Sequence, residues 1–253
     1  MSPARDAVVI NADDFGISAR VNHAIAECFA RGWITSATLM ANMPGFDEAC
    51  AMIVQRGLKG RIGQHLVVTE GPALTPGIRR WPRLCTPDGT LVGVPGSVFR
   101  LARDEARDLE AELVAQIEAA RARGVQPTHF DSHGHFHTQW PVATLVMRLA
   151  RRYDVPAIRL TRNCGPGIPV AKRIYKQAFN ARLHLLGFGR TDRFGSAADV
   201  ETLAHRGGRI EIMVHPGTGD SGEVIDLTPD PRPLAELASR WQATHRLASY
   251  SEL

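Results

Sequence analysis

Two adjacent carboxylates stand close to the beginning of the chain. Asp13 and Asp14 belong to the run Asn-Ala-Asp-Asp-Phe-Gly, which follows the apolar residues 7–10. Neighbouring carboxylates repel each other unless a cation or a proton relieves the repulsion. Aspartate and asparagine are also frequent in solvated turns, so the pair alone is compatible with either a turn or a cation site.

A histidine-rich segment forms the second group of reactive side chains. Residues 129–137 contain four histidines within nine positions. Alternate side chains of a strand share a face, so His129, Asp131 and His133 would point the same way if a strand extends that far. The alternative is a surface loop or a buried histidine with a structural role. One mononuclear site does not use all four imidazoles, so the cluster indicates ligand or catalytic chemistry without selecting a member.

Two further histidines lie at the ends of apolar segments. His65 falls in the segment 61–68, and His215 with a Pro-Gly pair follows the segment 209–214. Each of them alone is more typical of a structural residue. Together with an aspartate, however, two imidazoles suit a hydrolytic divalent ion and leave coordination positions for water and substrate. The sequence offers this set once, with the aspartate from the first expected strand and histidines from the third and fourth.

The elements that must position these residues alternate between short strands and helices. This alternation predicts an α/β fold with a parallel sheet and outer helices, in which active sites form at the carboxyl ends of the strands. A barrel-like fold, distorted or incomplete relative to a TIM barrel, and an open sheet both fit. No shift in composition divides the chain, so we expect a single domain over residues 1–253. Apolar patterns predict strands at 7–11, 34–40, 61–68, 128–132, 157–160, 191–194 and 209–214. They predict a first helix with Ser18 as its N-cap, Val21, Ile25, Cys28 and Phe29 as its apolar stripe, and Gly32 just past its end, and further helices at 46–55, 104–123, 141–153, 170–186 and 233–247.

The segment 69–101 interrupts this rhythm. It contains five prolines and five glycines, a composition that excludes a regular helix. A loop of this length inside a compact domain is often functional. We therefore expect a loop insertion near the active site, with Trp81 and Phe99 as its aromatic anchors.

The expected helix at 170–186 combines cations with apolar side chains. Such a helix can lie on an anionic membrane surface, or it can be an outer barrel helix that buries its apolar stripe. We favour the outer barrel helix, because a helix of this fold has to bury its own apolar side. The residues concerned are Lys172, Arg173, Lys176 and Arg182 beside Ile174, Tyr175, Phe179 and Leu183.

Composition excludes several classes of protein. The 253 residues are 44% hydrophobic and 22% charged, as in ordinary globular proteins. The net charge of +4 is small and dispersed, which argues against a nucleic-acid partner. No apolar run is long enough to span a membrane, and no secretory leader is recognisable. Four widely spaced cysteines without a C-x-x-C pair predict free thiols and a cytoplasmic location.

Four motifs together resemble those of the YdjC/ChbG/HpnK carbohydrate deacetylase family. They are Asn-Ala-Asp-Asp-Phe-Gly at 11–16, Gly-Gln-His-Leu at 63–66, Asp-Ser-His-x-His-x-His at 131–137 and His-Pro-Gly at 215–217. The resemblance implies a metal-dependent enzyme that removes acetyl groups from N-acetylated amino sugars, on a barrel-like and sometimes distorted β/α fold. Some members are dimers, so the resemblance leaves a homodimer open.

The resemblance also implies roles for individual residues. The metal ligands of the family fall on Asp14, His65 and His133, which would bind one divalent ion, either Mg²⁺ or Zn²⁺. Asp13 matches the general base, and His215 matches the histidine that protonates the leaving amine.

Two further positions bear on this assignment. Gly134 stands where some members carry another histidine, a departure that leaves the three ligands intact but alters substrate contacts. Arg159 lies in the expected strand 157–160, where we expect it to orient the general base. A metal-dependent phosphoesterase on a related barrel and an inactive sugar-binding protein are the alternative functions. The acceptor sugar and its chain length do not follow from the sequence.

Overall fold

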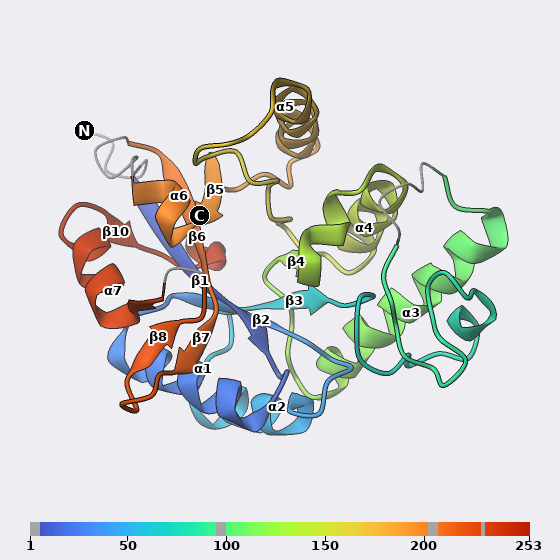
Figure 1. The fold of residues 1–253 in the computed structure, drawn as a ribbon, viewed down its shortest axis with the longest axis horizontal. Coiled ribbons are helices and arrows are strands. Elements are labelled where there is room, and N and C mark those ends of the chain that lie inside the picture. Colours follow the sequence, from blue (N-terminus) through green and yellow to red (C-terminus); the bar gives the residue numbers. More distant parts are fainter. Residues whose placement is uncertain (1–5, 95–99, 202–206, 229–230) are drawn as a thin grey trace.

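A curled parallel sheet forms the centre of the molecule (Figure 1). The computed structural model describes residues 6–94, 100–201, 207–228 and 231–253. Six strands follow one another in the order β4-β3-β2-β1-β6-β5, all neighbours being parallel. The alternation of strands and helices is thereby confirmed. The strands are β1 (Ala7–Phe15), β2 (Ser36–Leu39), β3 (Ile62–Leu66), β4 (Phe130–Ser132), β5 (Arg193–Ser196) and β6 (Arg209–Val214).

Helices surround this sheet. In Figure 1, α1 and α2 lie below the strands, and α3 and α4 lie to their right. Ser18 caps the amino end of α1 by accepting a hydrogen bond from the Val21 backbone, and Gly32 ends it in the left-handed conformation with φ of 69°. The helices are α1 (Ala19–Arg31), α2 (Phe46–Gln55), α3 (Arg103–Ala122), α4 (Trp140–Arg152), α5 (Val170–Leu185), α6 (Ala197–Val200) and α7 (Leu234–Gln242).

The two edges of the sheet are bridged by the segment 157–163, which makes the sheet an incomplete barrel. The backbone N–H of Arg159 donates to the carbonyl of Phe130 in β4 at 2.9 Å, and that of Asn163 donates to the carbonyl of Phe194 in β5 at 3.1 Å. The segment thus leaves one edge and reaches the other. For this reason the strand expected at 157–160 is wrong, and only an isolated bridge joins Ile158 to β4.

The carboxyl-terminal third departs further from the expectation. A small antiparallel sheet of β7 (Pro216–Thr218), β8 (Val224–Asp226) and β9 (Arg232–Pro233) follows β6. The last helix ends at Gln242, and β10 (Arg246–Leu247) pairs with the start of β1. Strands of two or three residues leave little periodicity in a sequence, which is why the patterns missed them.

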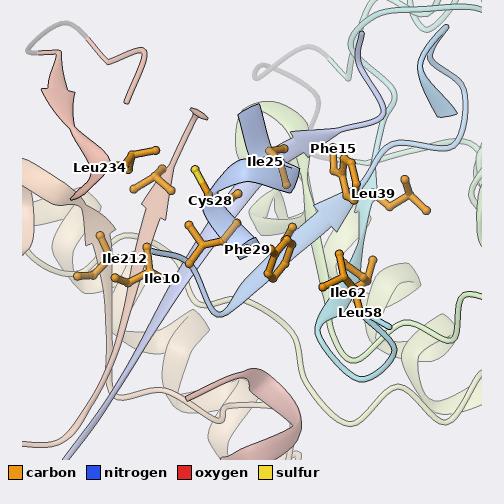
Figure 2. Packing of buried hydrophobic residues seen from close by; sticks show 14 of the residues in the cluster. Ile10, Phe15, Ile25, Cys28, Phe29, Leu39, Leu58, Ile62, Ile212 and Leu234 are labelled. Atoms are coloured by element: carbon orange, nitrogen blue, oxygen red, sulfur yellow. The ribbon is translucent and has the colours of Figure 1, made fainter. Parts of the chain in front are cut away.

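Apolar packing holds the inner face of α1 against the sheet (Figure 2). Ile25 and Cys28 of the helix are fully buried among strand residues such as Ile10 and Ile212. Burial of one such aliphatic side chain contributes roughly 1.5–3 kcal/mol to folding. A second apolar cluster lies between α3, α4 and the β3–β4 edge. These two clusters fix the strands whose ends carry the polar side chains.

The segment 69–101 packs on α3 as an irregular layer. Its described residues, 69–94 and 100–101, contain one short 3₁₀ turn, η1 (Ile78–Arg80), and isolated bridges rather than a regular helix. Trp81 anchors it as expected, because its indole N–H donates to Asp108 of α3 at 2.8 Å. Glu112 of α3 is fully buried beneath it. The other expected anchor, Phe99, lies outside the described residues.

Helix α5 does not bury its apolar side as expected. Phe179 and Leu183 are buried, but Ile174 is 63% exposed and Tyr175 is 40% exposed. The helix stands at the top edge of the molecule in Figure 1, so only one narrow face touches the rest of the chain. Among the described residues, no helix is both long and apolar enough to cross a membrane.

Candidate active site

Three side chains predicted as metal ligands converge at the carboxyl ends of the strands. Asp14 lies at the end of β1, His65 in β3, and His133 directly after β4. Asp14 Oδ1 is 3.2 Å from His65 Nε2 and 2.9 Å from His133 Nδ1. All three ligand atoms fall within 4.8 Å of one another. The structure therefore brings together residues that are up to 119 positions apart in sequence.

A local distortion of β1 separates the two aspartates. The strand extends to Phe15, so Asp13 and Asp14 lie within it and not in a turn after it, as the sequence pattern had suggested. The register against β2 shifts between Ala12 and Phe15, and Asp14 has a φ of +67°. A positive φ is uncommon for a residue other than glycine and persists only where the surroundings enforce it. The distortion directs Asp14 to the rim, while Asp13 points into the barrel.

His65 is held in one orientation by a buried carboxylate. Its Nδ1–H donates to Asp131 Oδ1 at 2.7 Å, and the Thr38 hydroxyl donates to Asp131 Oδ2 at 3.1 Å. This arrangement leaves Nε2 of His65 directed at Asp14, and it is the pattern by which carboxylates orient histidine ligands of metals. Burial opposes ionisation, yet Asp131 and Asp14 raise the pKa of His65 to about 10. The site thus has an excess of negative charge.

The donor set fits one divalent cation. A carboxylate oxygen and two imidazole nitrogens are borderline ligands that Zn²⁺ accepts readily and that other hydrolytic metals share. A second cluster of Asp13, His65 and Asp131 is also compact, but the Arg159 guanidinium already lies between its carboxylates. Among the described residues, Asp14, His65 and His133 therefore form the set that best fits a metal ion.

Asp13 is clamped by the arginine that was predicted to orient it. Arg159 NH1 and NH2 each donate to one oxygen of Asp13 at 2.7 Å, and Asn11 donates to Asp13 Oδ1 at 2.9 Å. Burial raises the pKa of Asp13, but the guanidinium outweighs it and the pKa is lowered overall. Asp13 is therefore an ionised carboxylate with fixed geometry.

Arg159 itself is fully buried within a ring of acids. Besides Asp13 it contacts Asp131 at 2.6 Å and Glu211 at 2.8 Å, and Glu211 accepts a hydrogen bond from the Tyr250 hydroxyl at 2.5 Å. A buried guanidinium is tolerated when several hydrogen-bonded carboxylates surround it. The network explains why Asp13 and Asp131 keep their positions.

His215 directly follows β6, the strand that pairs with β1. Ala12 of β1 pairs with Val214 of β6, so Asp13 and His215 are the next residues on adjacent parallel strands. Side chains in register on neighbouring strands share a face. The His215 backbone N–H donates to Asp226 Oδ1 at 2.7 Å. His215 also lines a cavity of about 440 Å³, whose lining does not include Asp13, Asp14, His65 or His133.

The remaining histidines of the cluster have structural contacts. His129 stacks on Tyr250 with ring centroids 3.7 Å apart, and burial lowers its pKa to about 3. His137 is buried between the Ser132 hydroxyl and the Arg159 carbonyl. His135 is largely buried, with a pKa lowered to about 4 by burial. His133 alone of the four joins the set that fits a metal.

Four residues of the site had no role predicted from the sequence. Asp131 orients His65, Glu211 holds Arg159, and Asp226 binds the His215 backbone. Glu70, at the start of the segment 69–101, lies 2.7 Å from His133 Nε2. Of these four, only Asp131 could have been found from the sequence, because it alternates with His129 and His133 and would share their face of a strand. The others depend on contacts across the fold.

Comparison with known proteins places the chain. A family model described as YdjC-like protein matches residues 7–249. The chain belongs to the YdjC-like family. Among curated relatives of this YdjC-like chain, a carbohydrate deacetylase of Geobacillus stearothermophilus is 34% identical, with 92% of the chain and 93% of the relative covered. A carbohydrate deacetylase of Halalkalibacterium halodurans is 32% identical, with 83% and 84% covered.

The fold of the YdjC-like chain also has a solved counterpart. A crystal structure from Enterococcus faecalis, described as a candidate cellobiose-phosphate cleavage protein, aligns with a TM-score of 0.71 over 97% of this chain and 98% of the other. The sequences are 22% identical, so this likeness concerns the fold alone. It agrees with the distorted barrel-like α/β architecture.

Proposed function

We propose that this chain is a metal-dependent carbohydrate deacetylase that hydrolyses the acetamide of an N-acetylated amino sugar and releases acetate. The observation that carries the proposal is the set of Asp14, His65 and His133 at the strand ends, beside the clamped carboxylate of Asp13. The curated relatives, which are carbohydrate deacetylases, support the class of reaction.

Each polar residue of the site has a task in this reaction. Asp14, His65 and His133 would hold one divalent ion, Mg²⁺ or Zn²⁺, which supplies Lewis acidity and makes a bound water more acidic. Asp13 accepts the proton of the attacking water at a carboxylate oxygen. Arg159 keeps that carboxylate ionised and aligned through two hydrogen bonds.

His215 completes the proposed reaction as the proton donor. An amine leaves poorly from a tetrahedral centre unless its nitrogen is protonated, and a positioned imidazolium performs this task. The register of β1 and β6 supports the role, because Asp13 and His215 are the residues that follow the last matched pair of these strands, Ala12 and Val214. The hydrogen bond from the His215 backbone to Asp226 fixes the place where the imidazole leaves the strand.

The segment 69–101 acts in this proposal as the rim that selects the sugar. Its residue Glu70 contacts the ligand His133, and the rest of the segment is anchored to α3. The four cysteines are free and buried, which supports a reducing, cytoplasmic location.

A panel of N-acetylated sugars tests the proposed reaction. The protein is stripped of metal, Mg²⁺ or Zn²⁺ is added back, and released acetate is measured. We expect acetate to appear only with metal, at one ion per chain. Phosphate release from phosphoesters without acetate release would favour the phosphoesterase, and sugar binding without turnover would favour the inactive binding protein.

A further inference from the structure

The outward face of α5 is apolar along its whole length. Val170 is 71% exposed, Ile174 is 63% exposed and Leu185 is 87% exposed. With 100° of rotation per residue, these three and the exposed alanines fall in one arc of about 100°. The alanines are Ala171, Ala178 and Ala181. An ordinary surface helix presents polar residues to solvent, so α5 inverts the usual pattern.

The contacts of the inner face of α5 show that the helix is not rotated so as to expose side chains that belong in the core. Phe179 and Leu183 are buried against the rest of the chain, and Asn180 binds Thr161 through both its amide oxygen and its amide nitrogen. The helix is therefore fixed in its rotation. The outward apolar arc remains for a different contact.

Positive charge surrounds this arc. Residues 160–191 contain six lysines and arginines and no aspartate or glutamate. By the helical repeat, Arg182 borders the arc on one side, and on the other side Arg173 follows the uncharged Gln177 and His184. The whole chain has a net charge of only +4, so the positive charge is concentrated here.

An exposed tryptophan extends the same surface. Trp140, at the start of α4, is 55% exposed, and the Arg182 guanidinium lies 5.2 Å from the centre of its ring. Tryptophan and arginine are amphipathic side chains that settle where an apolar phase meets water. They connect the apolar arc of α5 to the adjacent helix.

We propose that the outward face of α5, together with Trp140, docks on the surface of an anionic lipid bilayer. The apolar arc would enter the boundary between headgroups and acyl chains, and the bordering cations would contact anionic headgroups, as in other interfacial amphipathic helices. A second copy of the chain fits less well. Two copies of this face, joined by symmetry, would oppose cations with cations and offer no acidic residue from 160–191.

The side of α5 opposite the docking surface lines one of two cavities that share residues. Lys176 of α5 lines a cavity of about 350 Å³ together with His135, and this cavity shares Ser196 and Met213 with the one that contains His215. The docking itself does not depend on the proposed reaction.

Vesicle cosedimentation of the full chain tests the proposal. Vesicles of phosphatidylcholine are compared with vesicles that also contain phosphatidylglycerol, at low and high salt. We expect binding to the anionic vesicles at low salt, and at least a tenfold weaker partition at high salt or without phosphatidylglycerol, since exposed charges are screened by salt. Absence of binding to anionic vesicles at low salt would overturn the proposal.

Variants distinguish binding through this surface from non-specific adsorption to vesicles. The double variant Ile174→Ser with Leu185→Ser should weaken partition at least tenfold, and Arg173→Gln about fivefold. Val54→Ser serves as the matched control, because Val54 is 53% exposed on α2, away from α5. Circular dichroism confirms that each variant is folded. Equal binding by the double variant and the control would refute the assignment.

Self-association is the remaining competing outcome. Light scattering of the wild type and the double variant decides it. A monomeric wild type that binds vesicles supports the docking surface. A dimer that the Ile174→Ser, Leu185→Ser change converts to a monomer would show that a second copy covers α5, and the lipid proposal would be wrong.

Discussion

Consecutive aspartates of β1 occupy different chemical environments. Asp13 is only 2% exposed and accepts two hydrogen bonds from Arg159, whereas Asp14 faces two imidazoles at the rim. In a regular strand, neighbouring side chains point to opposite faces of the sheet, so one of the two carboxylates would lie outside the barrel. The positive φ of Asp14 keeps both at the site. The two carboxylates can therefore have separate roles.

Replacement of His65 tests the metal ligands. We predict that His65→Ala abolishes stoichiometric metal retention, because one of three protein ligands and its support from Asp131 are lost together. Metal content after dialysis, measured by elemental analysis, reports the result. His23→Ala is the matched control, since the His23 side chain is 67% exposed on α1. Full metal content in His65→Ala would show that the ligand assignment is wrong.

Asp13 can be tested without removal of a ligand. We predict that Asp13→Asn keeps the metal but lowers turnover by about 100-fold to 10,000-fold, because an amide does not accept the proton of water. Metal content and acetate release are measured on the same preparation. Turnover close to that of the wild type would exclude Asp13 as the base.

At the scale of elements, α3 holds the segment 69–101 in part through the buried carboxylate of Glu112. Glu112 accepts hydrogen bonds from the Leu74 and Thr75 backbone N–H groups at 2.9 and 2.8 Å and from the Thr75 hydroxyl at 2.7 Å. Three donors thus converge on one side chain with no exposure to solvent. The position of the segment depends on this contact more than on its own few bridges.

Removal of that carboxylate should loosen the segment. We predict that Glu112→Ala lowers the free energy of unfolding by about 2–4 kcal/mol, because buried donors lose their acceptor. Urea unfolding measures the loss. If the segment selects the sugar, the ranking of substrates by kcat/KM should change while metal content stays the same. An equal loss on every substrate would assign the segment a structural role only.

At the scale of the whole molecule, the buried network makes stability depend on pH. Burial raises the pKa of Glu211 from 4.5 to about 7, although Arg159 and Tyr250 act in the opposite direction. The folded state therefore binds this proton more tightly than the unfolded state does. The resulting stability is fully present below about pH 4.5 and is lost as the pH rises through about 7.

A neutral substitute for Glu211 tests this dependence. We predict that between about pH 4.5 and 7 the wild type loses on the order of 1–3 kcal/mol relative to Glu211→Gln. Urea unfolding of metal-stripped protein across this range measures the difference. Parallel pH profiles of the two proteins would show that Glu211 titrates normally in the fold.

Much of the fold follows from local patterns. The apolar stripe of α1, its cap at Ser18 and its end at Gly32 were all readable from the sequence, because capping and amphipathicity act over a few residues. The same holds for the alternation that predicts parallel strands with polar residues at one end. The prediction of a strand at 157–160 was wrong because the path of that segment depends on distant parts of the chain, namely the two sheet edges that it bridges.

The site, too, has features that local sequence predicts and features that depend on the tertiary structure. The residue types of Asp13, Asp14, His65 and His133 and their places near strand ends were determined by the sequence, with their roles supplied by resemblance to a family. Only the tertiary structure decided that Arg159 clamps Asp13 and that Asp131 orients His65. Such contacts join residues far apart in the chain, and no local pattern encodes which of many charged residues will meet inside the incomplete barrel. The exposed arc of α5 has the same origin, because a helical pattern reports apolar faces but not which face the rest of the fold leaves uncovered.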